Sequence, residues 1–197
     1  NEEKIKEVQK RFNNKKIILY FGVISPRKGQ EIAIKAFSEI YEKIPDFVLV
    51  IAGSATKEFK DYEKYLCNLT KKMNLDKNVI FTGYVKNNEI APLFNLADFS
   101  MHTYGQMSSS THALTFSIQH SKPVIVSNIE TFHEILNDDE AIFVNIGKQK
   151  ELENAILNLA KEDNLKKQLE NNMKNVAKRF TWDKNAEKHF SIYKKLS

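Results

Sequence analysis

A short loop that directly follows a buried apolar run carries two adjacent cations. The loop is GVISPRKGQ, residues 22–30, and it leads into a segment with helical spacing. Gly22 allows a tight backbone turn, and Arg27 and Lys28 bring two positive charges close to the start of that helix. Free N–H groups and the helix dipole favour anions there, so phosphate is the predicted ligand. An ordinary surface turn explains the loop equally well when it is taken alone.

A second loop is rich in hydroxyl groups. In MSSSTH, residues 107–112, four consecutive side chains bear a hydroxyl, and a helix is predicted directly after them. These residues are Ser108, Ser109, Ser110 and Thr111. A helix N-cap accounts for one of the hydroxyls, and four exceed what a cap requires. We therefore predict that this loop offers hydroxyls and backbone N–H groups to a ligand.

Two further candidates lie where predicted strands end. In TGYVKNNE, residues 82–89, Gly83 and Tyr84 are placed to wall a planar ring, although half-buried packing explains Tyr84 equally well. His102 ends another predicted strand, beside the hydroxyl-rich loop. Ligands of open α/β sheets bind beyond the carboxyl ends of the strands, so these residues join the candidate site.

Several kinds of site are excluded by what the sequence lacks. No carboxylate occurs between Asp98 and Glu130, so the central loops hold no acid pair for glycoside hydrolysis. Asp138 and Asp139 do not form a D-x-D pattern, and the histidines are scattered without metal-ligand spacing. The dinucleotide fingerprint, the Walker motif and the G-x-S-x-G elbow are absent. A nicotinamide-dependent oxidoreductase and a serine hydrolase are disfavoured, and neither a metal nor a cofactor is expected.

Apolar runs alternate with segments of helical periodicity, and these elements must position the loops. The runs predict six strands, at residues 17–22, 47–53, 79–83, 98–104, 123–128 and 141–145. Helical spacing predicts helices near residues 1–16, 33–44, 59–73, 88–97, 109–121 and 131–136. Continuous apolar strands separated by helices imply a parallel sheet covered on both faces. The predicted fold is α/β, a doubly wound, Rossmann-like sheet of six parallel strands with C-terminal helices.

From about residue 148 onward the chain is predicted to be wholly helical. Three helices follow one another there, each with apolar residues at intervals of three and four. The stripe of the last helix consists of Trp182, Ala186, Phe190 and Tyr193. We expect most of these apolar positions to belong to the core.

Composition bounds the class of protein. The 197 residues carry 30 Lys and Arg against 25 Asp and Glu, a net charge of +5, and 42% are hydrophobic. A core can therefore be buried, and the lysines are spread over helix faces, so no nucleic-acid binding is expected. The single cysteine, Cys67, excludes an intrachain disulfide and fits a reducing compartment. No apolar run is long enough to cross a membrane and no leader is visible, so a soluble intracellular domain is expected.

Taken together, these segments resemble the C-terminal, donor-binding half of a retaining glycosyltransferase of the GT-B fold, family 4. The likeness runs in order through FGVISPRKG, FVLVIAG, VIFTGYVKNNEIAPLFNLAD, KPVIVSN and FTWDKNAEKHFSIYKKL. It covers nearly the whole chain, and the ordered series is specific although each piece alone is weak. The resemblance implies a hexosyltransferase that binds a nucleotide-diphosphate sugar and transfers the sugar without a metal ion.

The resemblance also assigns roles to individual residues. Lys28 matches the lysine that binds the donor diphosphate, and Gly83 and Tyr84 match the loop that meets the nucleobase. Val23 replaces the family's usual arginine after the glycine that ends the first strand, and Arg27 is the candidate substitute. Some family members have a serine-rich turn like residues 108–111, whose hydroxyls and N–H groups are therefore expected to hold the diphosphate.

One departure from the family leaves a second hypothesis open. The family's two glutamates, eight residues apart, read the sugar and the ribose, and their places are held by Ser108 and Phe116. Phe116 cannot accept a hydrogen bond from a ribose hydroxyl. The alternative is therefore a degenerate binding or scaffolding module that kept the fold and lost donor chemistry. No residue is assigned as catalytic, because the resemblance implies that part of the catalytic site lies in the N-terminal domain.

The resemblance finally implies a division of the protein. Residues 1–16 are expected to be a junction helix from an N-terminal acceptor domain, and residues 17–179 the nucleotide-sugar-binding domain. Residues 180–197 are expected to cross back onto the acceptor domain. The acceptor implied is a glycan or lipid-linked glycan of polysaccharide biosynthesis, in the cytoplasm or at the inner face of the membrane, with room for peripheral membrane contact.

Overall fold

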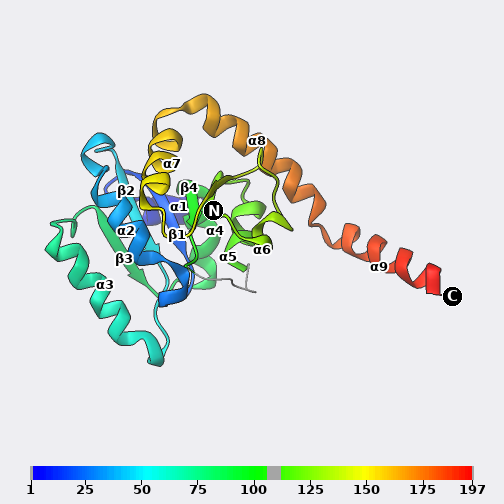
Figure 1. Ribbon diagram of the computed structural model, residues 1–197, viewed down its shortest axis with the longest axis horizontal. Coiled ribbons are helices and arrows are strands. Elements are labelled where there is room, and N and C mark those ends of the chain that lie inside the picture. The colour runs from blue at the N-terminus through cyan, green and yellow to red at the C-terminus, as the bar shows by residue number, and fades with distance from the viewer. Residues whose placement is uncertain (1, 106–111, 197) are drawn as a thin grey trace.

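Six apolar segments form one parallel sheet in the computed structural model, which describes residues 2–105 and 112–196. The strands are β1 (Lys16–Phe21), β2 (Phe47–Ala52), β3 (Val79–Gly83), β4 (Ala97–His102), β5 (Val124–Ser127) and β6 (Ile142–Val144). Their order is β3-β2-β1-β4-β5-β6, and every neighbouring pair is parallel. Figure 1 labels the first four strands of the chain. The predicted doubly wound sheet is confirmed. Its strand order reverses at the boundary between β1 and β4, which is where ligands of such sheets bind.

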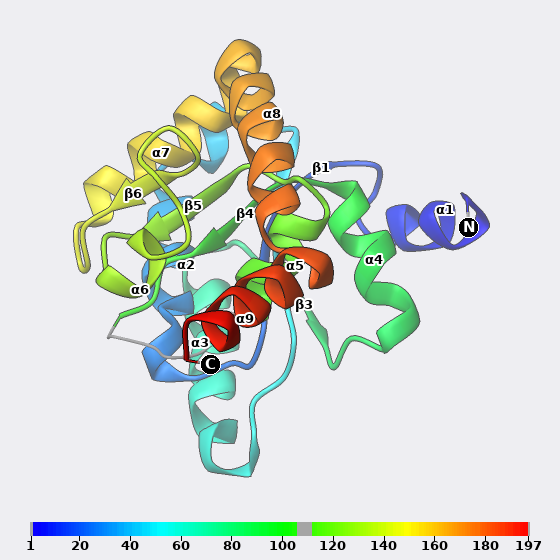
Figure 2. The same ribbon diagram turned by 90° about the vertical axis from the view of Figure 1, so that its right-hand side faces the viewer.

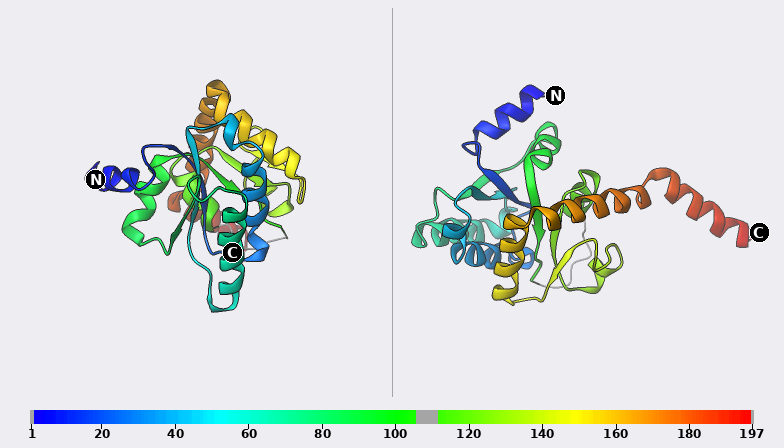
Figure 3. Two further views of the ribbon diagram at one scale, coloured as in Figure 1. Left: turned by 90° about the vertical axis from the view of Figure 1, so that its left-hand side faces the viewer. Right: turned by 90° about the horizontal axis from the view of Figure 1, so that it is seen from above.

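Helices cover both faces of the sheet (Figure 3). The described helices are α1 (Glu2–Lys10), α2 (Gln30–Ser38), α3 (Lys60–Lys72), α4 (Asn87–Leu96), α5 (His112–Gln119), α6 (Glu130–His133), α7 (Gln149–Lys161), α8 (Asp163–Arg179) and α9 (Trp182–Leu196). Short 3-10 turns lie at η1 (Pro26–Lys28), η2 (Tyr41–Lys43) and η3 (Lys57–Phe59). Alternate residues of β1 and β2 face opposite helix layers, with Ile18 and Leu49 on the side of α2 and α7. Ile17 and Val48 face α1 and α4 on the other side.

The first helix belongs to the packed body of the molecule. It lies beside α4 (Figure 2), and two of the apolar side chains in and just after it, Val8 and Phe12, are 2% and 1% exposed. They join a core cluster with Leu93 and Phe94 of α4. The helix predicted within residues 1–16 is confirmed, and it contributes to this domain's own core.

The helix predicted over residues 33–44 is shorter than expected. α2 ends at Ser38, whose hydroxyl donates to the carbonyl of Lys35, and the 3-10 turn η2 follows. Ile40 and Ile44 are still buried, at 1% and 4% exposure. Their spacing therefore predicted correctly that both side chains are buried. The backbone that carries them is a turn and not a continuation of α2.

The expectation that most apolar positions after residue 148 belong to the core is confirmed in α7 and α8, where Leu152, Ile156, Leu159, Leu169, Met173 and Val176 are buried. The apolar stripe of α9 is the exception among the residues that can be compared. α9 projects away from the body of the molecule (Figure 1), and Phe190 and Tyr193 are 61% and 65% exposed. Ala186 is exposed as well. A helical period shows that one face is apolar but does not show what covers that face. None of the helices in the described part of the chain is long and apolar enough to span a membrane.

A bidentate ion pair fixes the end of α8 to the loop before β6. The two guanidinium nitrogens of Arg179 lie 2.7 and 2.8 Å from the carboxylate oxygens of Glu140, a buried residue. The N–H of Asn137 donates to the same carboxylate at 2.9 Å. Burial by itself raises the pKa of the Glu140 carboxyl, but the hydrogen bonds from Arg179 and Asn137 outweigh it and lower this pKa.

Glu140→Gln is expected to lower the free energy of unfolding at pH 7 by about 1–2 kcal/mol, since a charge-assisted pair is lost and Arg179 stays half-exposed. Because the folded-state pKa of Glu140 lies below the unfolded one, this stabilisation is present above the unfolded pKa and is lost as pH falls through the folded pKa. Urea unfolding of both proteins between pH 7 and pH 3 measures it. An equal difference at both ends of that range would contradict the assignment.

Candidate functional site

The loop after β1 and the chain after β4 meet at the switch point of the sheet. The N–H of Gly105 donates to the carbonyl of Arg27 at 2.9 Å. Gly29 has φ +77°, and a Cβ there would lie 1.8 Å from the carbonyl oxygen of Thr103. Only glycine allows so close a contact between two backbones. The cationic loop is therefore fastened directly to the segment that leads toward the hydroxyl-rich loop.

The backbones that follow β1 and β2 are also in close contact with each other. Gly22 has φ +134°, as a tight turn after β1 requires, and its N–H donates to the carbonyl of Ala52 at 2.9 Å. A Cβ on Gly53 would lie 1.9 Å from the carbonyl oxygen of Gly22. This close backbone approach shapes the floor of a cavity next to β1.

That cavity, which we call the β1–β3 cavity, has a volume of about 300 Å³ and lies at the carboxyl ends of three adjacent strands. It is lined by Phe21, Gly22, Val23, Lys28, Ala52, Gly53, Ser54, Tyr84, Val85, His112 and Ala113. Gly22, Lys28 and Tyr84, three of the predicted site residues, thus come together from distant parts of the sequence. His112 and Ala113 bring the first described turn of α5 to the same cavity.

Tyr84 is the exposed aromatic wall of this cavity. Its side chain is 74% exposed, so half-buried packing does not describe it. The neighbouring Gly83 has φ +66° and open space around its Cα, which turns the chain so that Tyr84 reaches the rim. A large aromatic ring that is left in water beside a cavity is available for stacking against a planar ligand.

Lys28 is the cation that reaches the cavity. Its side chain is half-buried, and its ammonium lies 3.8 Å from the centre of the Tyr104 ring. Burial and the adjacent charge of Arg27 lower the pKa of Lys28. No ion pair with a carboxylate neutralises Lys28 in the described parts of the chain. An ammonium that is partly desolvated and not neutralised is suited to bind an anion.

The remaining predicted residues are placed differently. Arg27 is exposed and lines neither this cavity nor the larger one described below. Ser108, Ser109, Ser110 and Thr111 lie outside the residues that the structure describes.

His102 is a core residue and not a surface contact. It is 0% exposed, and its Nε2 lies 3.0 Å from the hydroxyl of Ser117 and 3.4 Å from that of Ser100. Burial, with a smaller contribution from the charge of Lys28, lowers the pKa of His102 to about 3, so the ring is neutral. Because β4 lies between β1 and β5, a side chain at its end can be enclosed completely, and direct ligand binding by His102 is not supported.

Phe116, which stands where the resembled family has its second glutamate, packs among aromatic rings. Its ring centre lies 5.6 Å from that of Phe21 and 5.7 Å from that of Phe94. It thereby supports the back of the β1–β3 cavity through Phe21. The Phe116 side chain carries no hydrogen-bonding group.

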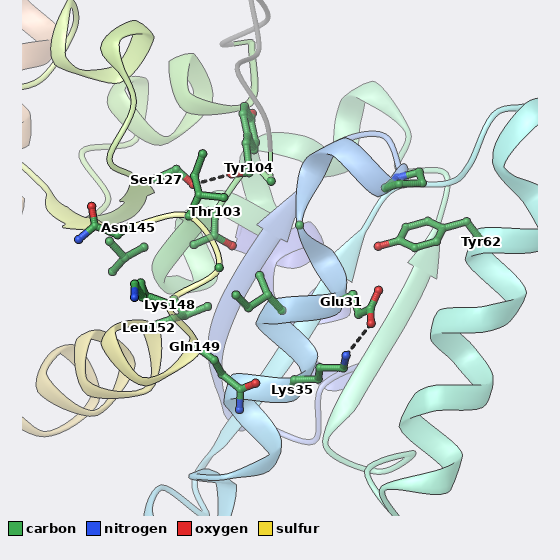
Figure 4. Close-up of a pocket in the computed structure, with 17 residues that line it drawn as sticks. Glu31, Lys35, Tyr62, Thr103, Tyr104, Ser127, Asn145, Lys148, Gln149 and Leu152 are labelled. Atoms are coloured by element: carbon green, nitrogen blue, oxygen red, sulfur yellow. Dashed lines mark hydrogen bonds and ion pairs between the residues drawn. The ribbon is translucent and has the colours of Figure 1, made fainter.

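A second and larger cavity opens on the other side of η1, between α2 and α7 (Figure 4). Its volume is about 460 Å³, and Glu31 and Lys35 form an ion pair of 2.6 Å in its wall. None of the predicted site residues that the structure describes lines it. Sequence reasoning missed Tyr104, whose ring lies under the Lys28 ammonium and in the wall of this cavity; the only signal was an aromatic residue at the end of a predicted strand.

Comparison with known proteins gives a family match and a fold match. Residues 1–176 match the family model described as glycosyl transferases group 1. The uncharacterized glycosyltransferase MJ1069 of Methanocaldococcus jannaschii is 22% identical over 193 residues, 97% of this chain and 48% of the relative. The chain thus spans about half the length of this curated relative.

Two crystal structures have the same fold. Anabaena HepE in complex with UDP and glucose superposes with a TM-score of 0.87 at 21% identity, over 98% of this chain and 53% of that one. The C-terminal domain of a glycosyl transferase group 1 family protein, LpcC of Francisella tularensis, gives a TM-score of 0.77 at 22% identity, over 87% of this chain and 91% of that one.

Proposed function

Since the chain belongs to the glycosyl transferases group 1 family, we propose that it is the donor half of a glycosyltransferase and binds a nucleotide-diphosphate sugar in the β1–β3 cavity. The single observation that carries this proposal is the convergence of Gly22, Lys28 and Tyr84 on one cavity at the switch point of the sheet. Lys28 was the candidate for the diphosphate and Tyr84 for the base of such a ligand, and Gly22 for the tight turn that begins the cationic loop.

The chemistry of the cavity wall matches the parts of a nucleotide. Tyr84 and Val85 offer an aromatic and apolar surface for a base, and Lys28 offers a cation for the diphosphate. The start of α5 contributes to the same cavity, and a helix N-terminus favours negative charge. UDP bound to HepE, whose fold is similar, supports the same class of ligand.

The proposed reaction is transfer of the sugar with retention of its anomeric configuration and without a metal ion. When the bond to the sugar breaks, negative charge develops on the departing diphosphate. The Lys28 ammonium, with Arg27 nearby and the dipole of α5, would stabilise that charge electrostatically. No side chain of this chain is proposed to attack the sugar.

The acceptor and its binding domain belong to the same proposal. We propose a glycan or lipid-linked glycan as acceptor, bound by an N-terminal domain at the cytoplasmic side of a membrane. The exposed apolar stripe of α9 supports a second domain, because Phe190 and Tyr193 are 61% and 65% exposed, which is unusual for a helix facing only water.

Calorimetric titration of the chain with UDP, GDP, ADP and dTDP, and with inorganic phosphate as the reference, tests the proposal. At least one nucleotide is expected to bind more tightly than phosphate does. If all four bind no more strongly than phosphate, the nucleotide site does not exist.

The degenerate-module hypothesis is tested with the whole protein. Sugar transfer or donor hydrolysis that is abolished by replacing Ser109 to Thr111 with alanine would eliminate it. Tight nucleotide binding without any turnover would instead favour it over the transferase.

Tyr84→Ala is expected to weaken nucleotide binding by about 1 kcal/mol, roughly fivefold, because stacking of a base on an exposed ring is at the lower end of the usual range. Tyr84→Phe keeps the ring and should bind as the wild type does. Equal affinity of the alanine and phenylalanine variants in the same titration would remove Tyr84 from the site.

A further inference from the structure

The backbone of Lys28 is held by a phenol from the core. The hydroxyl of Tyr20 donates a hydrogen bond to the carbonyl oxygen of Lys28 and lies 3.4 Å from the hydroxyl of Thr103. Tyr20 is a residue of β1 that is only 2% exposed, so the strand beneath the loop carries the donor. A buried, hydrogen-bonded phenol of this kind has few alternative positions.

The other end of Lys28 is held by a second buried ring. The ammonium lies 3.8 Å from the centre of the Tyr104 ring, a cation–π distance. Tyr104 is 2% exposed and is itself fixed by Phe132, at a ring-centre distance of 5.2 Å, and by the edge-on ring of His102 at 6.4 Å. Unlike a carboxylate, the Tyr104 ring attracts the ammonium of Lys28 without neutralising its positive charge.

We propose that Tyr20 and Tyr104 are positioning residues that hold Lys28 at its carbonyl and at its ammonium, and so aim the charge before any ligand arrives. The consequence for binding rests on the proposed function. A free lysine side chain loses much rotamer freedom when it binds, and fixing it beforehand is worth about tenfold in affinity. The ring covers one side of the ammonium and leaves the N–H groups on the other sides for phosphate oxygens.

The buried position of both tyrosines also fits a purely structural role in the core, and the Tyr104 hydroxyl separates the two explanations. This hydroxyl is buried and has no hydrogen-bond partner in the described parts of the chain. Tyr104→Phe therefore keeps everything that the proposal uses and serves as the matched control. Tyr104→Leu removes the ring, and Tyr20→Phe removes only the hydroxyl that holds the Lys28 carbonyl.

The experiment measures the Lys28 side chain directly by NMR in the ligand-free chain, with Lys28→Ala as the blank for assignment. Protons above an aromatic face resonate upfield, so the ε-methylene of Lys28 should be shifted upfield in the wild type and in Tyr104→Phe. The shift should vanish in Tyr104→Leu and be reduced in Tyr20→Phe. UDP affinity, by titration, should fall about tenfold in Tyr104→Leu, about fivefold in Tyr20→Phe, and stay unchanged in Tyr104→Phe.

The NMR measurement tests the positioning of Lys28, and the titration tests the proposed function, so the two proposals can be contradicted independently. If the wild type shows the upfield shift and binds no nucleotide, the proposed function is wrong and the anchoring of Lys28 stands. If the Lys28 signal is the same in Tyr104→Leu and in the wild type, the positioning role is wrong whatever UDP does. Should Tyr104→Leu fail to fold, Tyr20→Phe decides, and an unchanged Lys28 shift and UDP affinity in that variant overturn the proposal.

Discussion

Replacing Lys28 with alanine is expected to weaken binding of the tightest nucleoside diphosphate by about 1.5–3 kcal/mol, roughly 10- to 150-fold. Lys28 is the cation that lines the β1–β3 cavity among the described residues, and its ammonium is not neutralised by a carboxylate there. Removing it takes away a charge-assisted hydrogen bond to the diphosphate. The loss should be larger for a diphosphate than for the nucleoside alone, which has no charge to lose. Calorimetric titration of both ligands measures the difference.

Two matched lysine and arginine variants make this prediction specific. Lys35 lies in the other cavity and is paired with Glu31 at 2.6 Å, so Lys35→Ala should leave nucleotide affinity unchanged. Arg27 is exposed and lines neither cavity, so Arg27→Ala should have a smaller effect than Lys28→Ala. Equal losses in all three variants would indicate a general effect of net charge and would contradict a specific role for Lys28.

Gly29→Ala is expected to lower the free energy of unfolding by about 2–5 kcal/mol. Its φ of +77° is unfavourable for alanine, and the added Cβ would lie 1.8 Å from the carbonyl oxygen of Thr103. Because that neighbour is backbone, the loop after β1 must separate from the chain after β4. Denaturant unfolding measures the loss of stability, and nucleotide titration should show a parallel loss of affinity because the same loop carries Lys28.

Gly147 provides the control for backbone strain. It has nearly the same φ, +75°, but no atom lies within 4 Å of a Cβ built there. Gly147→Ala should therefore cost only the conformational strain, about 1–2 kcal/mol. If both variants were destabilised equally, the close contact between Gly29 and Thr103 would not be what fixes the loop.

Local sequence patterns were sufficient to predict most of the strands and helices. Apolar runs such as residues 47–53 predicted β2, which is buried along its whole length, because a central parallel strand is covered on both faces and shows no alternation. The tight turn predicted at Gly22 is also present, because glycine tolerates the φ of +134° found there, which few other residues adopt. The convergence of Lys28 and Tyr84 followed from the rule that parallel strands end at one edge of the sheet.

Other features depend on contacts between residues far apart in the chain. His102 and Tyr104 belong to the same strand end, yet one is enclosed by serine hydroxyls and the other lies under the Lys28 ammonium. Alternation along a strand cannot distinguish these environments, because the neighbours come from α5 and from the loop after β1. The aromatic setting of Phe116 likewise depends on Phe21 and Phe94, which lie on other elements.

The sequence by itself determined which segments become strands and helices and which loops carry charge, because those properties follow from the order of side chains within a few residues. The tertiary structure alone decided that Tyr20 donates a hydrogen bond to the carbonyl of Lys28 and that the Tyr104 ring lies under its ammonium. It also decided that the apolar stripe of α9 is not covered by the described residues. The physical reason is that packing and desolvation depend on which surfaces meet in space. A periodic pattern records that a surface is apolar or charged, but it does not record the surface against which it comes to lie.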